Sequence, residues 1–273
     1  MEMTTVKLSP TVGAEVMGVD AKILLEDEKV AAWTLDALDE YGVLVFRGLH
    51  LDDATQLAFS ERLGRLEVFG ERPEIFRVTL DPAKNPVASY LRGTFDWHID
   101  GMTEDIPIMA TLLSAHAVAT SGGETEFAST YAAYDDLSTE EKQRLATIRV
   151  VHTLEATQRL VNPDPTPEEV AVWRKRPSKV HPLVWTHLSG RRSLVLGATT
   201  ESVVGMDPSE GRAFLDALLT RATAPDRVYR HEWAVGDLVI WDNTGVLHRA
   251  LPYDTMSPRD MHRTTLYGNE AVQ

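Results

Sequence analysis

The stretch GDLVIWDNTGVLHRA, residues 236–250, contains two short apolar runs separated by a polar turn. Its first run, Leu238–Trp241, is rich in β-branched and aromatic residues, and the Asp-Asn pair after it is typical of turns. The pattern predicts a strand, a turn and a second strand that carries His248. The Gly236-Asp237 pair just before the first strand is a hairpin signal.

Further strands are predicted where short β-rich segments are bounded by turn residues. These segments are Val43–Phe46, Met109–Leu113, Ile148–His152, Ser193–Leu196, Val228–Trp233 and Arg263–Tyr267. Helical spacing and capping boxes predict helices at Asp27–Tyr41, Leu51–Leu63 and Pro208–Ala222, and short helices that begin at Ser138 and Thr166. Many short strands, with helices gathered towards the first half, favour a mainly β fold with flanking helices over a doubly wound sheet.

Composition limits the chemistry that the chain can use. It has 273 residues, with no internal repeat or long linker, so we expect a single domain over residues 1–273. It has no cysteine, so His, Asp or Glu must hold any metal. The formal charge of 27 − 41 = −14 disfavours binding to nucleic acid or to an anionic membrane. Without a leader segment or an apolar run of about 20 residues, the protein is expected to be cytoplasmic.

The segment WHIDG, residues 97–101, is the candidate for a metal site. On a strand, residues two apart point to the same face, so His98 and Asp100 would present an imidazole and a carboxylate side by side. His248 could supply the third ligand. Two histidines and one carboxylate leave adjacent positions open on a first-row metal, as in non-haem Fe(II) oxygenases. His-x-Asp alone is a weak signal, because the same pattern also occurs in ordinary surface and core roles.

Two arginines that follow His248 predict an anion-binding site. If residues 259–263 are extended, Arg259, Met261 and Arg263 share one face, while His262 points away from the pocket. Two guanidinium groups facing a cavity would be costly as structural fillers, because an unpaired buried charge is unfavourable. They suit a carboxylate, which pairs with the planar guanidinium fork through two hydrogen bonds.

These residues resemble the taurine/2,4-dichlorophenoxyacetate dioxygenase family of Fe(II)- and 2-oxoglutarate-dependent enzymes. The resemblance rests on the spacing His98-x-Asp100 … His248 … Arg259 and covers most of the chain. The other motifs are GAEVMGVD at 13–20, YGVLVFRG at 41–48, GGET at 122–125 with the 131–137 stretch after it, WDN at 241–243 and RDMHRTT at 259–265. The family fold is a double-stranded β-helix, or jelly roll, with helices packed outside, which agrees with the strand-rich pattern.

The resemblance implies a role for each matching residue. The iron ligands are matched by His98, Asp100 and His248. Arg259 matches the arginine that pairs with the distal carboxylate of 2-oxoglutarate, and Thr125 matches a threonine whose hydroxyl supports the same carboxylate. Arg263 matches an arginine that can bind the anionic end of the prime substrate.

The resemblance also implies the reaction. Fe(II) would take up 2-oxoglutarate and O2, 2-oxoglutarate would be converted to succinate, and a C–H bond of the prime substrate would be hydroxylated. Hydroxylation next to a heteroatom would cleave the substrate. Asp100 argues against halogenation, because the related halogenases have a small residue at this position.

The prime substrate is implied only by the residues at 201–223 and 228–233, which look closer to the aryloxyalkanoate side of the family. They imply a small anionic organic substrate, a carboxylate with an apolar body. Sulfonates and sulfate esters remain as alternatives. Relatives often form dimers or tetramers, so a homo-oligomer is a further expectation.

Other readings of the same residues stay open. A non-catalytic jelly-roll binding protein could keep the pocket, and a zinc hydrolase could use the same three ligands. Intact ligands together with both arginines weigh against the binding protein, and the lack of an HExxH motif weighs against the hydrolase. The segment 71–96 matches no family motif, and its candidates for pocket contacts are Phe76, Tyr90, Leu91 and Arg92.

Several conspicuous side chains near the motifs have ordinary structural explanations. Trp97 and Trp241 are expected to pack in the core, Arg249 to be a surface charge, and Asp242 and Asn243 to fix the turn before His248. The remaining histidines lack ligand spacing and are expected to be structural or surface residues: His50, His116, His152, His181, His187 and His231.

Overall fold

A computed structural model of the protein describes residues 3–68 and 75–273. Its strands are β1 (Thr4–Lys7), β2 (Ala14–Met17), β3 (Val43–Phe46), β4 (Phe76–Val78), β5 (Ala110–Ala117), β6 (Thr125–Ser129), β7 (Arg149–His152), β8 (Lys179–Pro182), β9 (Val184–Thr186), β10 (Arg192–Leu194), β11 (Thr200–Val203), β12 (Val228–His231), β13 (Leu238–Asp242), β14 (Val246–Ala250) and β15 (Asp260–Leu266). Its helices are α1 (Ala21–Glu26), α2 (Val30–Tyr41), α3 (Asp53–Leu63), η1 (Ala88–Phe95), α4 (Thr130–Asp135), α5 (Thr139–Leu145), α6 (Leu154–Val161), α7 (Pro167–Trp173), α8 (Pro208–Ala222) and η2 (Pro225–Arg227). The predicted mixture of many short strands with flanking helices is confirmed.

The largest sheet has the strand order β1-β2-β3-β13-β5-β15-β4. At its centre, Val239 of β13 lies between Val45 of β3 and Leu113 of β5. Because successive side chains of a strand point to opposite faces, each central strand contributes to two cores. Ile240 packs with the helices α1–α3 on the outer face, whereas Val239 and Trp241 pack on the inner face. This double burial explains why β3 is apolar at every position and β13 is apolar up to its last residue, Asp242.

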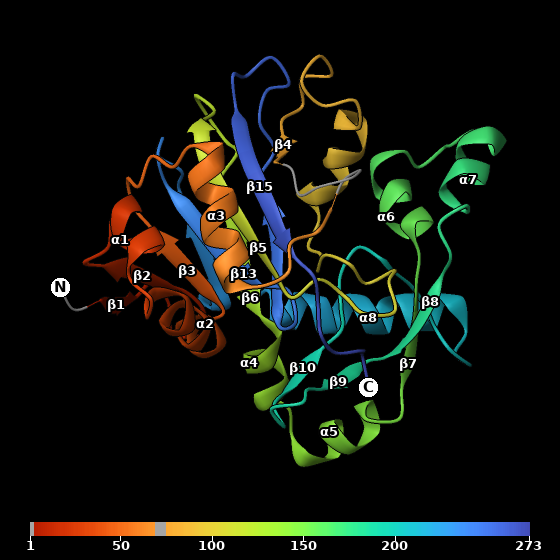
Figure 1. Ribbon diagram of the computed structural model, residues 1–273. Coiled ribbons are helices and arrows are strands. Elements are labelled where there is room, and N and C mark those ends of the chain that lie inside the picture. Colours follow the sequence, from red (N-terminus) through yellow and green to blue (C-terminus); the bar gives the residue numbers. More distant parts are fainter. Residues whose placement is uncertain (1–2, 69–74) are drawn as a thin grey trace.

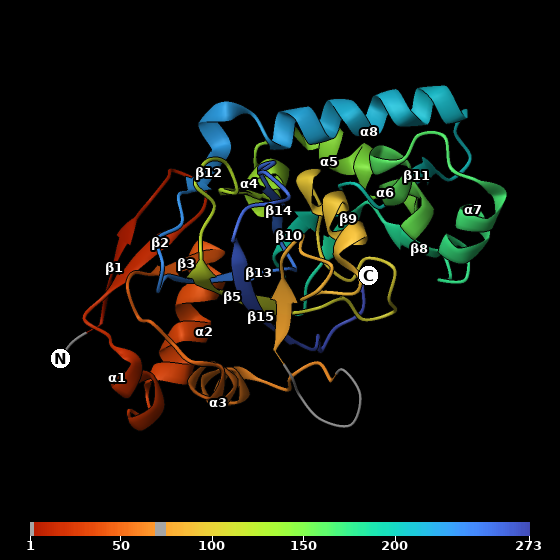
Figure 2. The ribbon, with the colours of Figure 1, turned by 90° about the horizontal axis from the view of Figure 1, so that it is seen from above.

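A smaller sheet, β12-β6-β14, lies against the inner face of the large sheet. Phe127 of β6, Tyr229 of β12 and Val246 of β14 join Val239 and Trp241 in one buried cluster. Helices α1, α2 and α3 lie on one side of the molecule and α8 on the opposite side, as Figure 2 shows. Helix α6 packs against η1 and α7. Helices α6 and α7 lie away from the N-terminal helices (Figure 1). The two facing sheets therefore enclose an interior that β5, β6, β13, β14 and β15 line.

The hairpin predicted at Gly236-Asp237 is wrong. β12 pairs with β6 in the small sheet, whereas β13 pairs with β3 and β5 in the large sheet. The turn therefore carries the chain from one sheet to the other. Gly236 adopts a φ of +94°, and the Asp237 carboxylate accepts a hydrogen bond from the backbone N–H of Ala234 at 3.0 Å. The predicted turn at this Gly-Asp pair is confirmed, but local sequence does not distinguish a hairpin from a sheet-to-sheet connection.

The helix predictions are largely confirmed. α8 has the predicted bounds, and α2 ends where expected, at Gly42, which has a φ of +70°. The predicted start of α2 at Asp27 is wrong, because a separate helix, α1, ends there. Asp27 is extended and forms the C-cap of α1, so the chain leaves one helix before it enters the next. The capping boxes at Ser138 and Thr166 both form.

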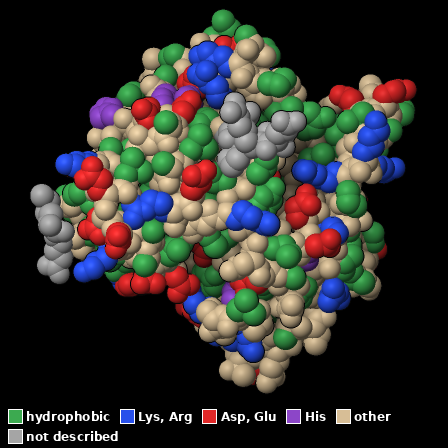
Figure 3. Space-filling model, viewed as in Figure 1, with side chains coloured by type: hydrophobic (Ala, Val, Ile, Leu, Met, Phe, Trp, Pro, Cys, Tyr) green, Lys and Arg blue, Asp and Glu red, His purple; other side chains and the backbone are tan. Residues whose placement is uncertain are grey.

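The surface carries both signs of charge. On the face drawn in Figure 3, acidic and basic side chains are interspersed, with small apolar groups between them. Within the described residues, none of the helices is both long and apolar enough to cross a membrane.

Gly245, in the turn before β14, leaves space for a buried aromatic ring. A Cβ at this position would lie 1.8 Å from Cε2 of Tyr131, which is only 7% exposed. We expect Gly245→Ala to lower the free energy of unfolding by about 1–3 kcal/mol, the usual cost of overpacking. Chemical denaturation measures the change. Gly64→Ala is the control, because its Cβ would meet only ordinary contacts at 3.6 Å and beyond. Equal stability of the two variants would contradict this packing.

Candidate active site

The three predicted metal ligands come together between the sheets. His98 and His248 form an isolated antiparallel bridge, with backbone N–H···O distances of 3.0 and 2.9 Å. The expected strand at residues 97–101 forms only in part, because Asp100 already lies in a turn with Gly101. The side chains still converge: Nε2 of His98 lies 3.7 Å from Oδ1 of Asp100, and Nε2 of His248 lies 3.7 Å from Oδ2. One ligand atom from each residue lies within 4.8 Å of the others.

Burial and neighbouring charges prepare these groups for a cation. Burial alone would raise the pKa of Asp100, but His248, Arg263 and His98 bring it below the ordinary value. Burial, reinforced by His98, lowers the pKa of His248 to about 3, so its imidazole is neutral at pH 7. Nδ1 of His98 lies 2.8 Å from the carbonyl oxygen of Asp96, which directs Nε2 towards Asp100. Two imidazoles and one carboxylate are a donor set that fits a first-row divalent metal.

Arg259 lies at the other end of the same cavity. Its guanidinium faces the ring of Tyr253 at 4.8 Å, and the residue is only 3% exposed, so burial lowers its pKa. No acidic side chain in residues 3–68 or 75–273 forms an ion pair with it. Gly123, at a φ of +79°, makes room for the side chain, because a Cβ there would lie 3.1 Å from Nε of Arg259. A buried guanidinium without an acidic partner favours an anionic ligand.

Thr125 lines the same cavity as this arginine, and a hydrogen bond from a tryptophan holds its hydroxyl group in place. The indole Nε1 of Trp233 donates to Oγ1 of Thr125 at 2.9 Å. Because an indole N–H only donates, the hydroxyl proton of Thr125 stays free to donate to a ligand. The sequence did not point to Trp233, which was expected only as the end of a strand.

Arg263 lines the same cavity from β15. Its guanidinium lies 4.6 Å from the centre of the Phe76 ring, and its buried Nε has no hydrogen-bond partner in the described part of the chain. The alternative of a structural ion pair is not seen among the ion pairs of the described residues. Arg259 and Arg263 therefore share one face, while Met261 packs in the core between the sheets.

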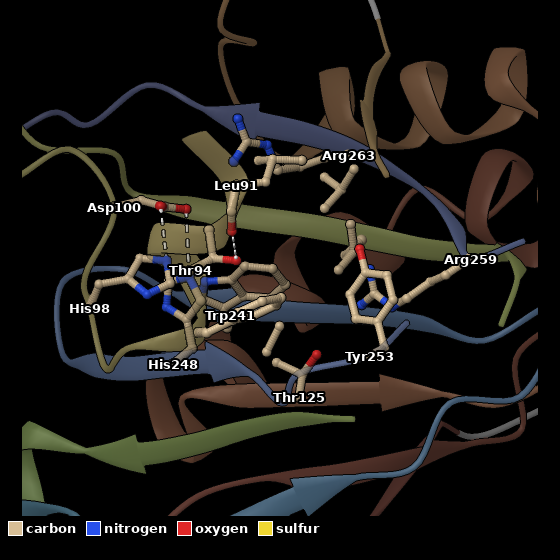
Figure 4. A pocket seen from close by; sticks show the side chains of 14 residues that line it. Leu91, Thr94, His98, Asp100, Thr125, Trp241, His248, Tyr253, Arg259 and Arg263 are labelled. Carbon is tan, nitrogen blue, oxygen red and sulfur yellow. Dashed lines mark hydrogen bonds and ion pairs between the residues drawn. The ribbon is translucent and has the colours of Figure 1, made fainter. Parts of the chain in front are cut away.

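The cavity between these groups is small. Its volume is about 60 Å³. In Figure 4, Asp100 and the two histidines lie on one side of it, Arg259 and Tyr253 on the other, and Arg263 along the upper edge. It is lined by Val78, Leu91, Thr94, Phe95, His98, Asp100, Leu113, Thr125, Trp241, His248, Ala250, Tyr253, Arg259 and Arg263.

A larger chamber adjoins this cavity. Its volume is about 530 Å³, and it shares Thr94, His98 and Asp100 with the smaller one. Residues of η1 and α6 form its wall, and Arg176 lies on it, 3.6 Å from Glu104. A molecule in this chamber could reach the metal ligands.

The four candidate contacts from the 71–96 segment separate in the structure. Leu91 lines the small cavity, and Phe76 reaches it through Arg263. Tyr90 lines the larger chamber, whereas Arg92 lines a groove between η1 and α7. Residues 71–74 lie outside the described residues.

His262 belongs to a second cluster, on the outer face of the large sheet. Its Nδ1 lies 2.5 Å from Oδ1 of Asp53, and its ring stacks on His116 at 3.6 Å with an angle of 17°. Three potential ligands therefore lie together, but lone pairs of two nearly parallel rings run side by side and do not converge on one ion. We interpret this cluster as a hydrogen-bonded pair with a stacked neighbour.

The expectations for the surrounding side chains are met in part. Arg249 pairs with the buried Glu126 at 2.7 Å and lies over the ring of Trp97, which packs in the core as expected. Trp241 does more than pack, because it lines the cavity, 4.8 Å from the His248 ring. Asp242 fixes the turn by accepting from the backbone N–H and hydroxyl of Thr244.

Most other histidines are held by ordinary partners. His187 contacts Glu270 and Ser193, His231 contacts Tyr229 and Asp237, and His152 contacts Thr199. Burial lowers the pKa of His152 to about 3, so it is a neutral hydrogen-bonding group. These contacts agree with the structural roles predicted for them.

Two histidines and a carboxylate that could hold one metal ion lie in the same cavity as a buried arginine with no acidic partner among the described residues, an arrangement that suits a metal-dependent enzyme with an anionic cosubstrate. The chain belongs to the family described as taurine catabolism dioxygenase TauD, TfdA family, which matches residues 4–265. The match covers both sheets and the whole cavity.

Known relatives agree with this assignment. The chain is 34% identical to an (S)-phenoxypropionate/alpha-ketoglutarate-dioxygenase of Sphingobium herbicidovorans, over 97% of this chain and 95% of the relative. It is also 34% identical to an alpha-ketoglutarate-dependent 2,4-dichlorophenoxyacetate dioxygenase of Cupriavidus pinatubonensis, over 100% of both chains. The crystal structure of AAD-2 in complex with Mn(II) and N-oxalylglycine superposes with a TM-score of 0.85 at 32% identity, and covers 100% of both chains.

Asp100→Ala should abolish the binding of Mn(II), because two imidazoles without a carboxylate hold a divalent ion weakly. Isothermal titration of the apoprotein with Mn(II) measures this, and the wild-type protein should bind one ion. Asp53→Ala, in the His116 and His262 cluster, is the matched control and should bind as the wild type does. If Asp100→Ala binds normally and Asp53→Ala does not, the metal lies at the outer cluster.

Proposed function

We propose that the protein is an Fe(II)- and 2-oxoglutarate-dependent dioxygenase that hydroxylates a small anionic organic substrate, a carboxylate of the aryloxyalkanoate kind. The observation that carries the proposal is one cavity with a two-histidine, one-carboxylate cluster at one end and, at the other, a buried arginine that pairs with no acidic side chain of the described residues. The phenoxypropionate and dichlorophenoxyacetate relatives support the substrate class.

His98, Asp100 and His248 would hold the iron. When bound, Fe(II) supplies the activation of O2 and, with 2-oxoglutarate, the oxidising power for hydroxylation of a C–H bond. The chain contributes three ligands on one side and leaves the other side open. Leu113, Leu91 and Phe95 exclude water from the cavity beside these ligands.

Arg259 and Thr125 would bind the distal carboxylate of 2-oxoglutarate. The guanidinium offers a planar pair of donors, and the Thr125 hydroxyl, which already accepts from Trp233, adds a third. Burial strengthens these contacts, because the low local dielectric leaves little screening.

Arg263 would bind the anionic end of the prime substrate. Phe76 contacts the guanidinium from one side, and Nε, which has no hydrogen-bond partner within residues 3–68 and 75–273, leaves hydrogen-bonding capacity for a ligand. The adjoining chamber of about 530 Å³ gives room for an apolar body. Oxidation of a carbon next to an ether oxygen would release the two parts of such a substrate.

Three wider expectations join this proposal. The two facing sheets fit a double-stranded β-helix, or jelly roll, and the whole chain would form one catalytic domain. The homo-oligomer stays a prediction. A sulfonate or sulfate ester would satisfy Arg263 in the same way, so these substrates form the second arm of the test.

Succinate release tests the function directly. Purified protein with Fe(II), 2-oxoglutarate and O2 would be incubated with a panel of aryloxyalkanoates, sulfonates and sulfate esters. We expect stimulated succinate release with an aryloxyalkanoate and none with Asp100→Ala. Stimulation only by sulfonates or sulfate esters would change the substrate class. A protein that binds Fe(II) and 2-oxoglutarate but releases no succinate with any compound would favour a binding protein.

Arg259→Ala should raise the 2-oxoglutarate concentration needed for half-maximal rate. Loss of a buried charge-assisted pair costs about 2–5 kcal/mol, or roughly 30- to 5,000-fold. Initial rates at varied 2-oxoglutarate measure the change. An unchanged requirement would place the cosubstrate elsewhere.

Arg263→Ala should affect the prime substrate and not 2-oxoglutarate, the reverse of Arg259→Ala. We expect the KM for the prime substrate to rise by roughly 30- to 5,000-fold, which corresponds to the loss of about 2–5 kcal/mol of pairing. The requirement for 2-oxoglutarate should stay near the wild-type value. Each arginine variant is the control for the other. If both variants change the same KM, the two arginines serve one ligand.

A further inference from the structure

A chain of hydrogen bonds leads from Trp241 to the candidate metal ligand Asp100. Nε1 of Trp241 lies 3.1 Å from Oδ1 of Asn243, and Nδ2 of Asn243 lies 2.8 Å from Oγ1 of Thr111. Oγ1 of Thr111 in turn lies 3.3 Å from Oδ2 of Asp100. None of these three supporting residues was expected to act on the metal site.

The direction of every bond in this chain is fixed by its first member. An indole N–H can only donate, so the side-chain oxygen of Asn243 must accept from Trp241. The amide nitrogen then faces Thr111 and donates to its hydroxyl oxygen. The single hydroxyl proton of Thr111 is therefore left for the carboxylate of Asp100. For an isolated asparagine the amide oxygen and nitrogen can be exchanged, and for an isolated threonine the hydroxyl proton can point either way; here the indole N–H fixes both.

The supporting residues are rigid. Asn243 and Thr111 are fully buried, and Trp241 is 3% exposed. Trp241 and Thr111 are direct partners in the pairing of β13 with β5. The backbone N–H of Asn243 donates to the carbonyl oxygen of Met109 at 2.9 Å, which fixes the turn to the start of β5. The chain thus ties Asp100 to the central strands.

Asp100 needs such support more than the two histidines do. His98 and His248 are held by their mutual backbone bridge, whereas Asp100 lies in a turn. A hydrogen bond to Oδ2 fixes the plane of the carboxylate and lets Oδ1, which faces His98, remain free. A neutral donor also stabilises the ionised form without bringing a cation that would compete with the metal.

We propose that Thr111 and Asn243 are positioning residues that hold the Asp100 carboxylate ready to bind the metal. Groups that orient ligands in this way commonly change metal affinity by about 10- to 100-fold when they are removed. This inference rests on the proposed function, because it takes Asp100 to be a metal ligand. It adds residues that touch neither the metal nor a substrate.

Titration of the apoprotein with Mn(II) alone tests the inference by calorimetry, without any need for turnover. Thr111→Val keeps the branched shape but removes the hydroxyl, and it should weaken Mn(II) binding by about 10- to 100-fold. Thr111→Ser restores the donor and should recover most of the affinity. Asn243→Asp should also weaken binding, because a carboxylate at this position would accept the Thr111 proton and draw it away from Asp100.

Thr265→Val is the matched control. Thr265 pairs directly with Thr111 across β5 and β15, it is 3% exposed, and its hydroxyl has no hydrogen-bond partner among the described residues. It should bind Mn(II) as the wild type does. Thermal unfolding of each variant verifies that the proteins compared are folded. If Asn243→Asp is unstable, the Mn(II) affinities of Thr111→Ser and Thr111→Val still test the role of the hydroxyl.

The outcomes separate the two claims. If the wild type binds one Mn(II) ion but Thr111→Val and Thr265→Val bind equally well, the positioning role is wrong and the metal site stands. If Thr111→Ser binds as weakly as Thr111→Val, packing and not the hydroxyl matters, and the inference is overturned. If the wild type binds no Mn(II), the metal site fails and the positioning role fails with it.

Discussion

Two backbone hydrogen bonds between His98 and His248 join distant parts of the chain, and the active site depends on them. His248 is fixed on β14 within the small sheet, whereas His98 follows η1 and has no full strand to hold it. The bridge brings both imidazoles to the same side and places Asp100, in the turn after His98, against their Nε2 atoms. A small movement of the η1 segment would separate the three ligands.

One buried charge in the cavity, the guanidinium of Arg259, has no acidic partner among the residues that the structure describes. Most buried charges elsewhere are paired: Glu126 binds two arginines, and Asp237 contacts Arg47 and His231. Arg259 differs, because it is buried against the ring of Tyr253 and forms no ion pair with any acidic side chain that the structure describes. Leaving a charge unpaired in the core costs stability, and a bound carboxylate removes that cost.

Local sequence was enough for many of the elements, and the motif spacing was enough to bring the three candidate ligands together. α8 and β3 have the predicted bounds, and His98, Asp100 and His248 meet as expected. The failures arise where long-range packing decides. The Gly236-Asp237 turn changes sheets, which no local pattern encodes. Thr125 is bonded by Trp233, which follows β12, and Asp100 is bonded by Thr111 of β5, so both partners come from distant parts of the chain. Asn243 was expected to fix a turn, and its side chain instead reaches across the sheet.

The central claim is that iron and 2-oxoglutarate share the cavity between Asp100 and Arg259. The most direct measurement is an anaerobic titration of the Fe(II)-loaded protein with 2-oxoglutarate, monitored for a visible metal-to-ligand charge-transfer band. The account predicts a band that saturates in the wild type, is lost in Asp100→Ala, and needs far more 2-oxoglutarate in Arg259→Ala. A wild-type protein that holds Fe(II) but shows no band would contradict the account.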